Sequence, residues 1–289
     1  MKPAPFGYVR PLDLEDLVGT LTDGDVLLAG GQSLLPELNE RRRRPRRLVD
    51  LNAVAGLEHC EAGPDRVLAG ALTRHRDLAE RSDVCAAVPV LSWAAQHVGH
   101  AAVRTRGTLG GSIANADPAA ELPGVCVLLD AMARLRSAAG ERTTAVANLM
   151  RPGGLAEHEV ITAVELPALR PGEGWGFREL SRPGAYAFPL VTVSTTLLLG
   201  ADGAVAGLRA AVTGAAAAPY ALPEGAVAGL LGAHPTDAWA DAVADQLAAA
   251  ADPVTDHYAS AAYRRRVVRH LGRQAVADAR QRAVPGAAA

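Results

Sequence analysis

Residues 106–118 read RGTLGGSIANADP, and residues 119–123 continue as AAELP. Glycines, hydroxyl side chains, an amide and a carboxylate are concentrated here, and together they can wrap a polar, jointed ligand. Glycine lets a ligand approach the backbone, hydroxyls can reach phosphate, and a carboxylate can accept hydrogen bonds from sugar hydroxyls. A polar surface loop without a ligand has a similar composition. We therefore expect a glycine-rich loop from Thr105 to Ala116, which either binds a ligand or covers the surface.

A shorter stretch of the same character, AGGQSLLP, occupies residues 29–36. It follows a predicted buried strand, Val26 to Ala29, and Ser33 supplies a hydroxyl where a short helix is expected to begin. Free backbone N–H groups at such a turn favour a bound anion such as a pyrophosphate. An ordinary strand-to-helix turn is the alternative, since glycine pairs are common in turns. Neither stretch has the G-x-G-x-x-G or G-x-x-x-x-G-K-[ST] order, which argues against a Rossmann or P-loop site.

Composition is that of an ordinary soluble globular protein. The 289 residues are 49% hydrophobic and 21% charged, and the formal net charge of -2 gives no reason to expect nucleic acid as a partner. Cys60, Cys85 and Cys126 lie far apart, whereas a cluster held by cysteines needs about four thiolates. No metal site is therefore expected. The N-terminus lacks the apolar core of a signal peptide and no segment is long enough to span a membrane, which predicts a cytoplasmic protein.

The order of the predicted elements divides the chain into two domains. We expect residues 1–170 to form the first, with subdomains of about 1–55 and 56–170, and residues 171–280 to form the second, before a tail at 281–289. Asp13 and Thr73 are predicted to cap helices. The C-terminal part is expected to fray after about Ala275. Its predicted elements are an antiparallel sheet and two helices: Phe177–Leu180, Val191–Leu199, Leu208–Thr213, Asp237–Ala250 and Ser260–Leu271.

The two glycine-rich stretches resemble the paired FAD-binding motifs of a known family. This family comprises the flavoprotein, or medium, subunits of molybdenum hydroxylases of the xanthine dehydrogenase and carbon monoxide dehydrogenase type. The order of the stretches and their separation of about 75 residues fit the family. The likeness extends to Tyr8–Pro11, to Val98–Arg104 and to the C-terminal segment Ala259–Arg265, and so covers most of the chain.

The resemblance implies an α+β protein. Its two-part FAD-binding domain would be of the vanillyl-alcohol oxidase (PCMH) type, followed by a C-terminal α+β domain with an antiparallel sheet and helices. FAD would be bound non-covalently, with its pyrophosphate at both stretches and Asp117 near the ribityl or ribose hydroxyls. We expect valine at Gly31 or Gly110 to abolish flavin binding by occupying the space of the phosphates. The expected cofactor-binding residues are Ala29, Gly30, Gly31, Gln32, Ser33, Leu34, Thr108, Gly110, Gly111, Ser112, Asn115 and Asp117.

The segment Arg182–Ala187 corresponds to a family stretch near the isoalloxazine ring. The resemblance places Tyr186 near the flavin ring, while no catalytic residue can otherwise be assigned. Ala185 stands where the family usually has an acidic residue. The stretch between Val146 and Val160 is also shorter than usual, so the partner surface or the flavin edge could have been repurposed.

In the family reading, electrons from a molybdenum-cofactor subunit pass through a [2Fe-2S] subunit to FAD in this chain. They then leave to NAD, a quinone or another acceptor. A free-standing FAD-dependent oxidase or dehydrogenase acting directly on a small molecule, for example in a biosynthetic pathway, is the main alternative. A nucleotide-binding or assembly protein that keeps the fold without redox work is a third interpretation. The three differ in whether the purified chain carries flavin and whether it needs partner subunits.

Overall fold

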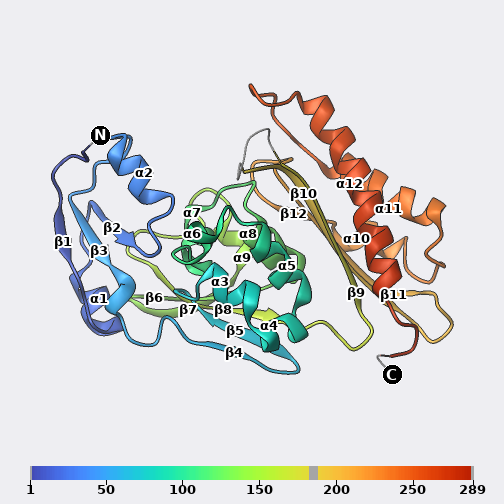
Figure 1. Ribbon diagram of the computed structural model, residues 1–289, viewed down its shortest axis with the longest axis horizontal. Helices are drawn as coiled ribbons and strands as arrows, with labels where there is room; N and C mark the ends of the chain where they lie inside the picture. Colours follow the sequence, from blue (N-terminus) through green and yellow to red (C-terminus); the bar gives the residue numbers. More distant parts are fainter. Residues whose placement is uncertain (1, 182–187, 288–289) are drawn as a thin grey trace.

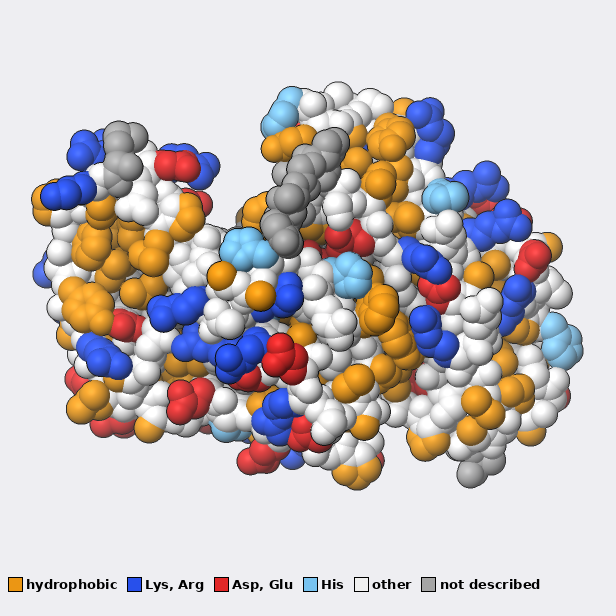
Figure 2. Space-filling model, in the orientation of Figure 1, with side chains coloured by type: hydrophobic (Ala, Val, Ile, Leu, Met, Phe, Trp, Pro, Cys, Tyr) orange, Lys and Arg blue, Asp and Glu red, His pale blue; other side chains and the backbone are white. Residues whose placement is uncertain are grey.

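The computed structural model describes residues 2–181 and 188–287. Three sheets lie one after another along the molecule, each formed by consecutive parts of the chain, and helices fill the space between and outside them (Figure 1). No helix in these residues is long and apolar enough to cross a membrane. Figure 2 shows a hollow between the N-terminal unit, at the left, and the rest of the molecule.

The N-terminal unit contains a small, fully parallel sheet in the order β1-β3-β2. Parallel neighbours require crossover connections, and two short helices provide them. The side chain of Asp13 accepts a hydrogen bond from the Asp16 N–H at 2.8 Å, so the predicted cap is confirmed. The predicted strand at Val26 is present, although it is half-buried rather than buried. The elements are β1 (Gly7–Val9), α1 (Leu14–Thr20), β2 (Asp25–Leu28), α2 (Leu34–Asn39), β3 (Arg47–Asp50) and the 3-10 turn η1 (Leu51–Ala53).

The central unit is a five-stranded antiparallel sheet in the order β4-β5-β8-β6-β7, with helices packed on it. Its strands are β4 (Cys60–Ala62), β5 (Arg66–Gly70), β6 (Met132–Ser137), β7 (Gly140–Ala145) and β8 (Val160–Pro167). Its helices are α3 (His75–Glu80), α4 (Ser82–Ala87), α5 (Pro89–His97), α6 (Ala101–Arg104), α7 (Leu109–Asn115), α8 (Glu121–Leu128) and α9 (Val146–Leu149).

Two details of this unit differ from expectation. Thr73 does not cap α3, because its hydroxyl donates to the His59 carbonyl at 3.0 Å and Arg74 occupies the N-cap position. Helix α8 has all eight of its residues buried and packs against both the central helices and strands of the third sheet. It therefore joins the central unit to the C-terminal one.

The C-terminal unit is the predicted antiparallel sheet, in the order β12-β11-β10-β9, with α11 and α12 along one face (Figure 1). Strand β10 is buried along its whole length because helices cover both faces of the sheet. The elements are β9 (Gly174–Ser181), β10 (Pro189–Leu199), β11 (Val205–Thr213), β12 (Tyr220–Ala221), α10 (Glu224–Ala228), α11 (Asp237–Ala250) and α12 (Ala261–Arg282).

The expected fraying after Ala275 is wrong, because α12 continues to Arg282. Ala275 and Ala279 are fully buried against β9. Glycines on that strand allow the close approach, since a Cβ added at Gly176 would overlap the Ala275 carbonyl. Alanine suits α12 here because a larger side chain would hold the helix away from the strand.

Candidate functional site

A cleft of about 630 Å³ lies where the N-terminal unit, the central unit and the start of β10 meet. Small-molecule sites are typically about 300–1,000 Å³, so this cleft is large enough for a cofactor. All twelve residues expected to bind a cofactor line it, although they come from two segments far apart in the sequence. Tyr186 lies outside the described residues.

The first glycine segment, residues 29–34, leaves its backbone donors free. The N–H groups of Gly30, Gly31, Gln32 and Ser33 donate to no group among residues 2–181 and 188–287. Gly31 has a left-handed φ of 72°, and the Gln32 side chain donates to the Gly30 carbonyl at 3.1 Å. Successive free N–H groups around a left-handed residue form a concave anion site. This segment therefore offers a set of preformed donors on the wall of the cleft.

The second segment contains a helix whose backbone donors are paired within the protein. The chain from Leu109 to Asn115 is helix α7, so the expectation of a loop through Ala116 is wrong for this part. The Thr108 hydroxyl accepts from the Gly111 N–H at 3.2 Å, and the Gly110 N–H donates to the Ala71 carbonyl at 2.9 Å. What remains for a ligand is a set of side chains, together with the N–H groups of Thr108 and Asp117, which donate to no group among the described residues.

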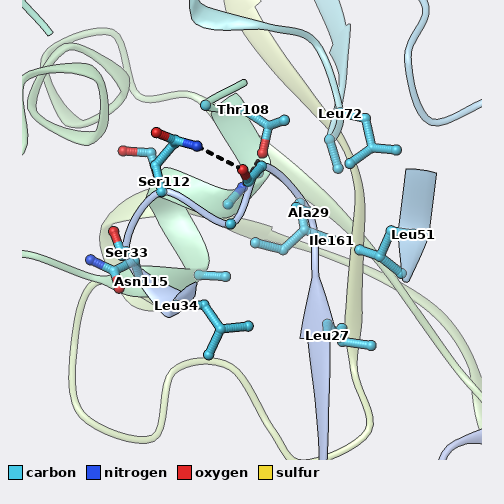
Figure 3. A pocket seen from close by; sticks show the side chains of 18 of the residues that line it. Leu27, Ala29, Ser33, Leu34, Leu51, Leu72, Thr108, Ser112, Asn115 and Ile161 are labelled. Carbon is cyan, nitrogen blue, oxygen red and sulfur yellow. Dashed lines mark hydrogen bonds between the residues drawn. The ribbon is translucent and has the colours of Figure 1, made fainter. Parts of the chain in front are cut away.

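Most of the labelled side chains of the cleft separate by polarity. In Figure 3, Ser33, Ser112 and Asn115 lie at the left of the close-up, with the apolar Leu34 below them, and Leu27, Leu51, Leu72 and Ile161 lie at the centre and right. A cleft with a polar part and an apolar part suits a ligand that joins phosphates and hydroxyls to an apolar ring system.

The glycines of both segments also allow the chain to pack on itself. A Cβ at Gly30 would overlap the Arg106 carbonyl and lie 2.9 Å from the Gly107 Cα. A Cβ at Gly110 would lie 2.6 Å from the Ala71 Cβ. A valine at Gly110 would therefore also clash with Ala71, the residue that follows β5, so packing within the protein is a further reason to expect a loss there. The closeness of Gly30 to Arg106 and Gly107 also shows that the two glycine segments are in contact.

Two side chains hold the segments at a fixed spacing. The Arg74 guanidinium donates to the Arg106 carbonyl at 2.6 Å and to the Asn52 Oδ1 at 2.7 Å. The Asn52 amide donates in turn to the Ala29 carbonyl at 2.9 Å. The sequence analysis missed both residues, because contacts to backbone carbonyls distant in sequence leave no motif.

Glu121, which lies inside the quoted stretch but was not predicted as a site residue, also lines the cleft. It is the first residue of α8 and only 6% exposed. Burial raises its pKa to about 8, and the nearby carboxyls of Glu179 and Asp117 add to the effect. The cleft therefore contains a carboxylic acid that keeps its proton at neutral pH.

Comparison with known protein families gives a match over nearly the whole chain. Residues 4–169 match the family described as FAD binding domain in molybdopterin dehydrogenase, and residues 175–279 match the CO dehydrogenase flavoprotein C-terminal domain. The chain is 36% identical to the 6-hydroxypseudooxynicotine dehydrogenase complex subunit alpha of Paenarthrobacter nicotinovorans, covering 99% of this chain and 98% of that one. It is 34% identical to the nicotine 6-hydroxylase medium subunit of the same organism, covering 96% and 99%.

Solved structures agree with this assignment. Carbon monoxide dehydrogenase from Hydrogenophaga pseudoflava superposes with a TM-score of 0.92 at 30% identity, covering 98% of this chain and 100% of that one. Quinoline 2-oxidoreductase from Pseudomonas putida 86 gives 0.89 at 31% identity, covering 97% and 99%. The predicted α+β fold, with an FAD-binding domain followed by a C-terminal domain, is therefore confirmed. The chain belongs to the FAD-binding flavoprotein subunits of the molybdenum hydroxylase family, as the resemblance of its two glycine segments implied.

Proposed function

We propose that the cleft holds FAD non-covalently, with the pyrophosphate at the first glycine segment. The observation that carries this proposal is the run of four free N–H groups from Gly30 to Ser33 on the cleft wall. Hydrogen bonds to charged groups are about twice as strong as those between neutral groups, so such donors favour an anionic ligand.

The remaining predicted residues would hold the cofactor through their side chains. Ser112 and Asn115 offer a hydroxyl and an amide, and Asp117 offers the free oxygen of a carboxylate whose Oδ1 already accepts from the Ala119 N–H at 2.8 Å. These groups can pair with the ribityl and ribose hydroxyls. The leucines and Ile161 exclude water from the apolar part of the cleft.

Bound FAD supplies the electron transfer itself, and this chain binds and orients it. We further propose that the chain passes electrons from a molybdenum-cofactor subunit and a [2Fe-2S] subunit to NAD, a quinone or another acceptor. Support comes from relatives that are named medium subunit or complex subunit and are matched along almost their full length. Residues 1–170 would bind the cofactor and residues 171–280 would close over it, as the family resemblance implies.

The visible spectrum of the chain purified alone tests the proposal. We expect flavin bands at roughly 370 and 450 nm, and FAD released by heat and identified by mass, because the protein leaves the redox chemistry to this cofactor. The flavin should stay oxidised with small-molecule substrates until the partner subunits are added. Reduction by a small molecule alone would instead support a free-standing oxidoreductase. A colourless chain that cannot be reconstituted with FAD would contradict the proposed site.

A further inference from the structure

His75 is a buried side chain of the cleft that no predicted motif contains. It begins α3, lines the cleft and is 5% exposed. Neither of its ring nitrogens makes a hydrogen bond of ordinary geometry among residues 2–181 and 188–287, although the Thr108 backbone lies close enough to influence the ring. Buried polar groups are normally paired, so an unpaired imidazole on a cleft wall indicates that a ligand or an ordered water completes it.

The backbone fixes the position of this ring. The His75 N–H donates to the Gly107 carbonyl at 3.0 Å, and the Leu109 N–H donates to the Thr73 carbonyl at 3.0 Å. The two chain segments therefore run side by side. A Cβ added at Gly107 would lie 2.7 Å from the His75 Nδ1, so the ring edge rests against that glycine. The His75 ring therefore leaves no room for a side chain at residue 107.

This placement brings His75 close to the free donors of the first segment. Gly107 contacts His75 on one side and Gly30 on the other, since a Cβ at Gly30 would lie 2.9 Å from the Gly107 Cα. One glycine residue thus separates the imidazole from the donors assigned above to the pyrophosphate.

The imidazole is neutral at physiological pH. Burial lowers its pKa to about 4; the Thr108 backbone opposes this shift in part, and the positive charges of Arg74 and Arg104 add to it. A neutral imidazole has one N–H donor and one acceptor nitrogen. It can donate to a phosphate oxygen without bringing a charge into the buried site.

We propose that His75 is a further cofactor-contacting residue, whose neutral imidazole donates a hydrogen bond to a pyrophosphate oxygen of FAD, directly or through one ordered water. The inference rests on the proposed function of the cleft. It explains why the chain keeps a polar ring at a position where an apolar side chain would pack without an unpaired group.

The test compares His75→Leu and His75→Gln with the wild type, using apo chains titrated with FAD and with riboflavin, which lacks the pyrophosphate. We expect His75→Leu to bind FAD about tenfold more weakly or worse, the scale of one hydrogen bond to a charged group. Its affinity for riboflavin should not change, and its melting temperature without ligand should be equal or higher. His75→Gln should recover part of the FAD affinity because its amide can still donate.

His97→Leu serves as the matched control, because His97 packs on Trp93 and Phe177 outside the residues lining the cleft. FAD binding by His75→Leu within twofold of the wild type would overturn the inference. So would an equal loss of FAD and riboflavin affinity together with a lower melting temperature, since that pattern marks a purely structural histidine. A wild-type chain that binds no FAD would contradict the proposed function itself. Normal FAD binding by both the wild type and His75→Leu would contradict only the role of His75.

Discussion

The two glycine segments have similar compositions, but they differ in whether their backbone N–H groups are paired within the protein. In the first, residues 29–34, four successive N–H groups are free at the cleft. In the second, Gly110 and Gly111 begin a helix whose N–H groups are paired within the protein, and Gly110 packs on Ala71. A glycine in a cofactor motif can thus serve the ligand or serve the fold, and only the contacts of its backbone distinguish the two roles.

Gly110→Val should have the largest effect, and it should act on the fold. The added side chain would overlap Ala71, and overpacking costs about 3 kcal/mol of unfolding free energy when the backbone must move. Urea unfolding of the apo chain measures this loss. Gly19→Val is the control, because nothing lies within 4 Å of a Cβ at Gly19. A Gly110→Val chain of normal stability that binds no FAD would reverse the assignment.

Arg74→Met should have the next largest effect, because it removes the hydrogen-bonded bridge between the two glycine segments. The variant loses the bonds to Arg106 and Asn52, which we expect to cost about 2 kcal/mol of unfolding free energy, with FAD affinity falling about tenfold. Arg76→Met is the control, since in the described part of the chain Arg76 has only an exposed pair with Asp77, at 3.5 Å. Equal effects of the two substitutions would rule out the bridge, and partial recovery by Arg74→Lys would support it.

Gly31→Ala should affect both stability and binding. A residue with a side chain at this φ of 72° lowers the free energy of unfolding by about 1–2 kcal/mol. Relief of the strain would shift the backbone and move the free N–H groups. Gly56→Ala has a similar backbone strain at φ 84°, away from the cleft and without the crowding against Leu35 that a Cβ at Gly31 would meet. We expect both variants to unfold at lower urea concentrations but only Gly31→Ala to bind FAD more weakly. Unchanged FAD binding by Gly31→Ala would exclude the first segment from the site.

Glu121→Gln should have the smallest effect, visible as a change in pH dependence. The folded-state pKa of Glu121 is raised to about 8, so between its unfolded pKa and pH 8 the folded chain binds more protons than the unfolded one. Stability from this group is thus complete at low pH and is lost as pH rises through that range. From pH 6 to 7 the wild type should lose about 1 kcal/mol relative to Glu121→Gln. Parallel stability curves for the two chains would contradict a buried, protonated carboxyl.

The sequence predicted best what depends on local pattern. Apolar runs identified β2 and β10, and the two motifs identified twelve residues that the fold brings to one cleft. The sequence did not predict the features that depend on tertiary contacts. Glycines suggested a loop at residues 109–115, but the Thr108 cap and Ala71 pairing stabilise a helix. Alanines suggested fraying at the C-terminus, but the glycines of β9 bury them. Asn52, Arg74 and His75 act through contacts that have no sequence signature.

The affinity of the apo chain for FAD compared with riboflavin, measured by titration under one set of conditions, tests the central claim most directly. If the free N–H groups of residues 30–33 hold the pyrophosphate, two hydrogen bonds to a charged group should make FAD bind at least about 100-fold more tightly than riboflavin. Equal affinities for the two ligands would show that these donors hold nothing, and would contradict the account.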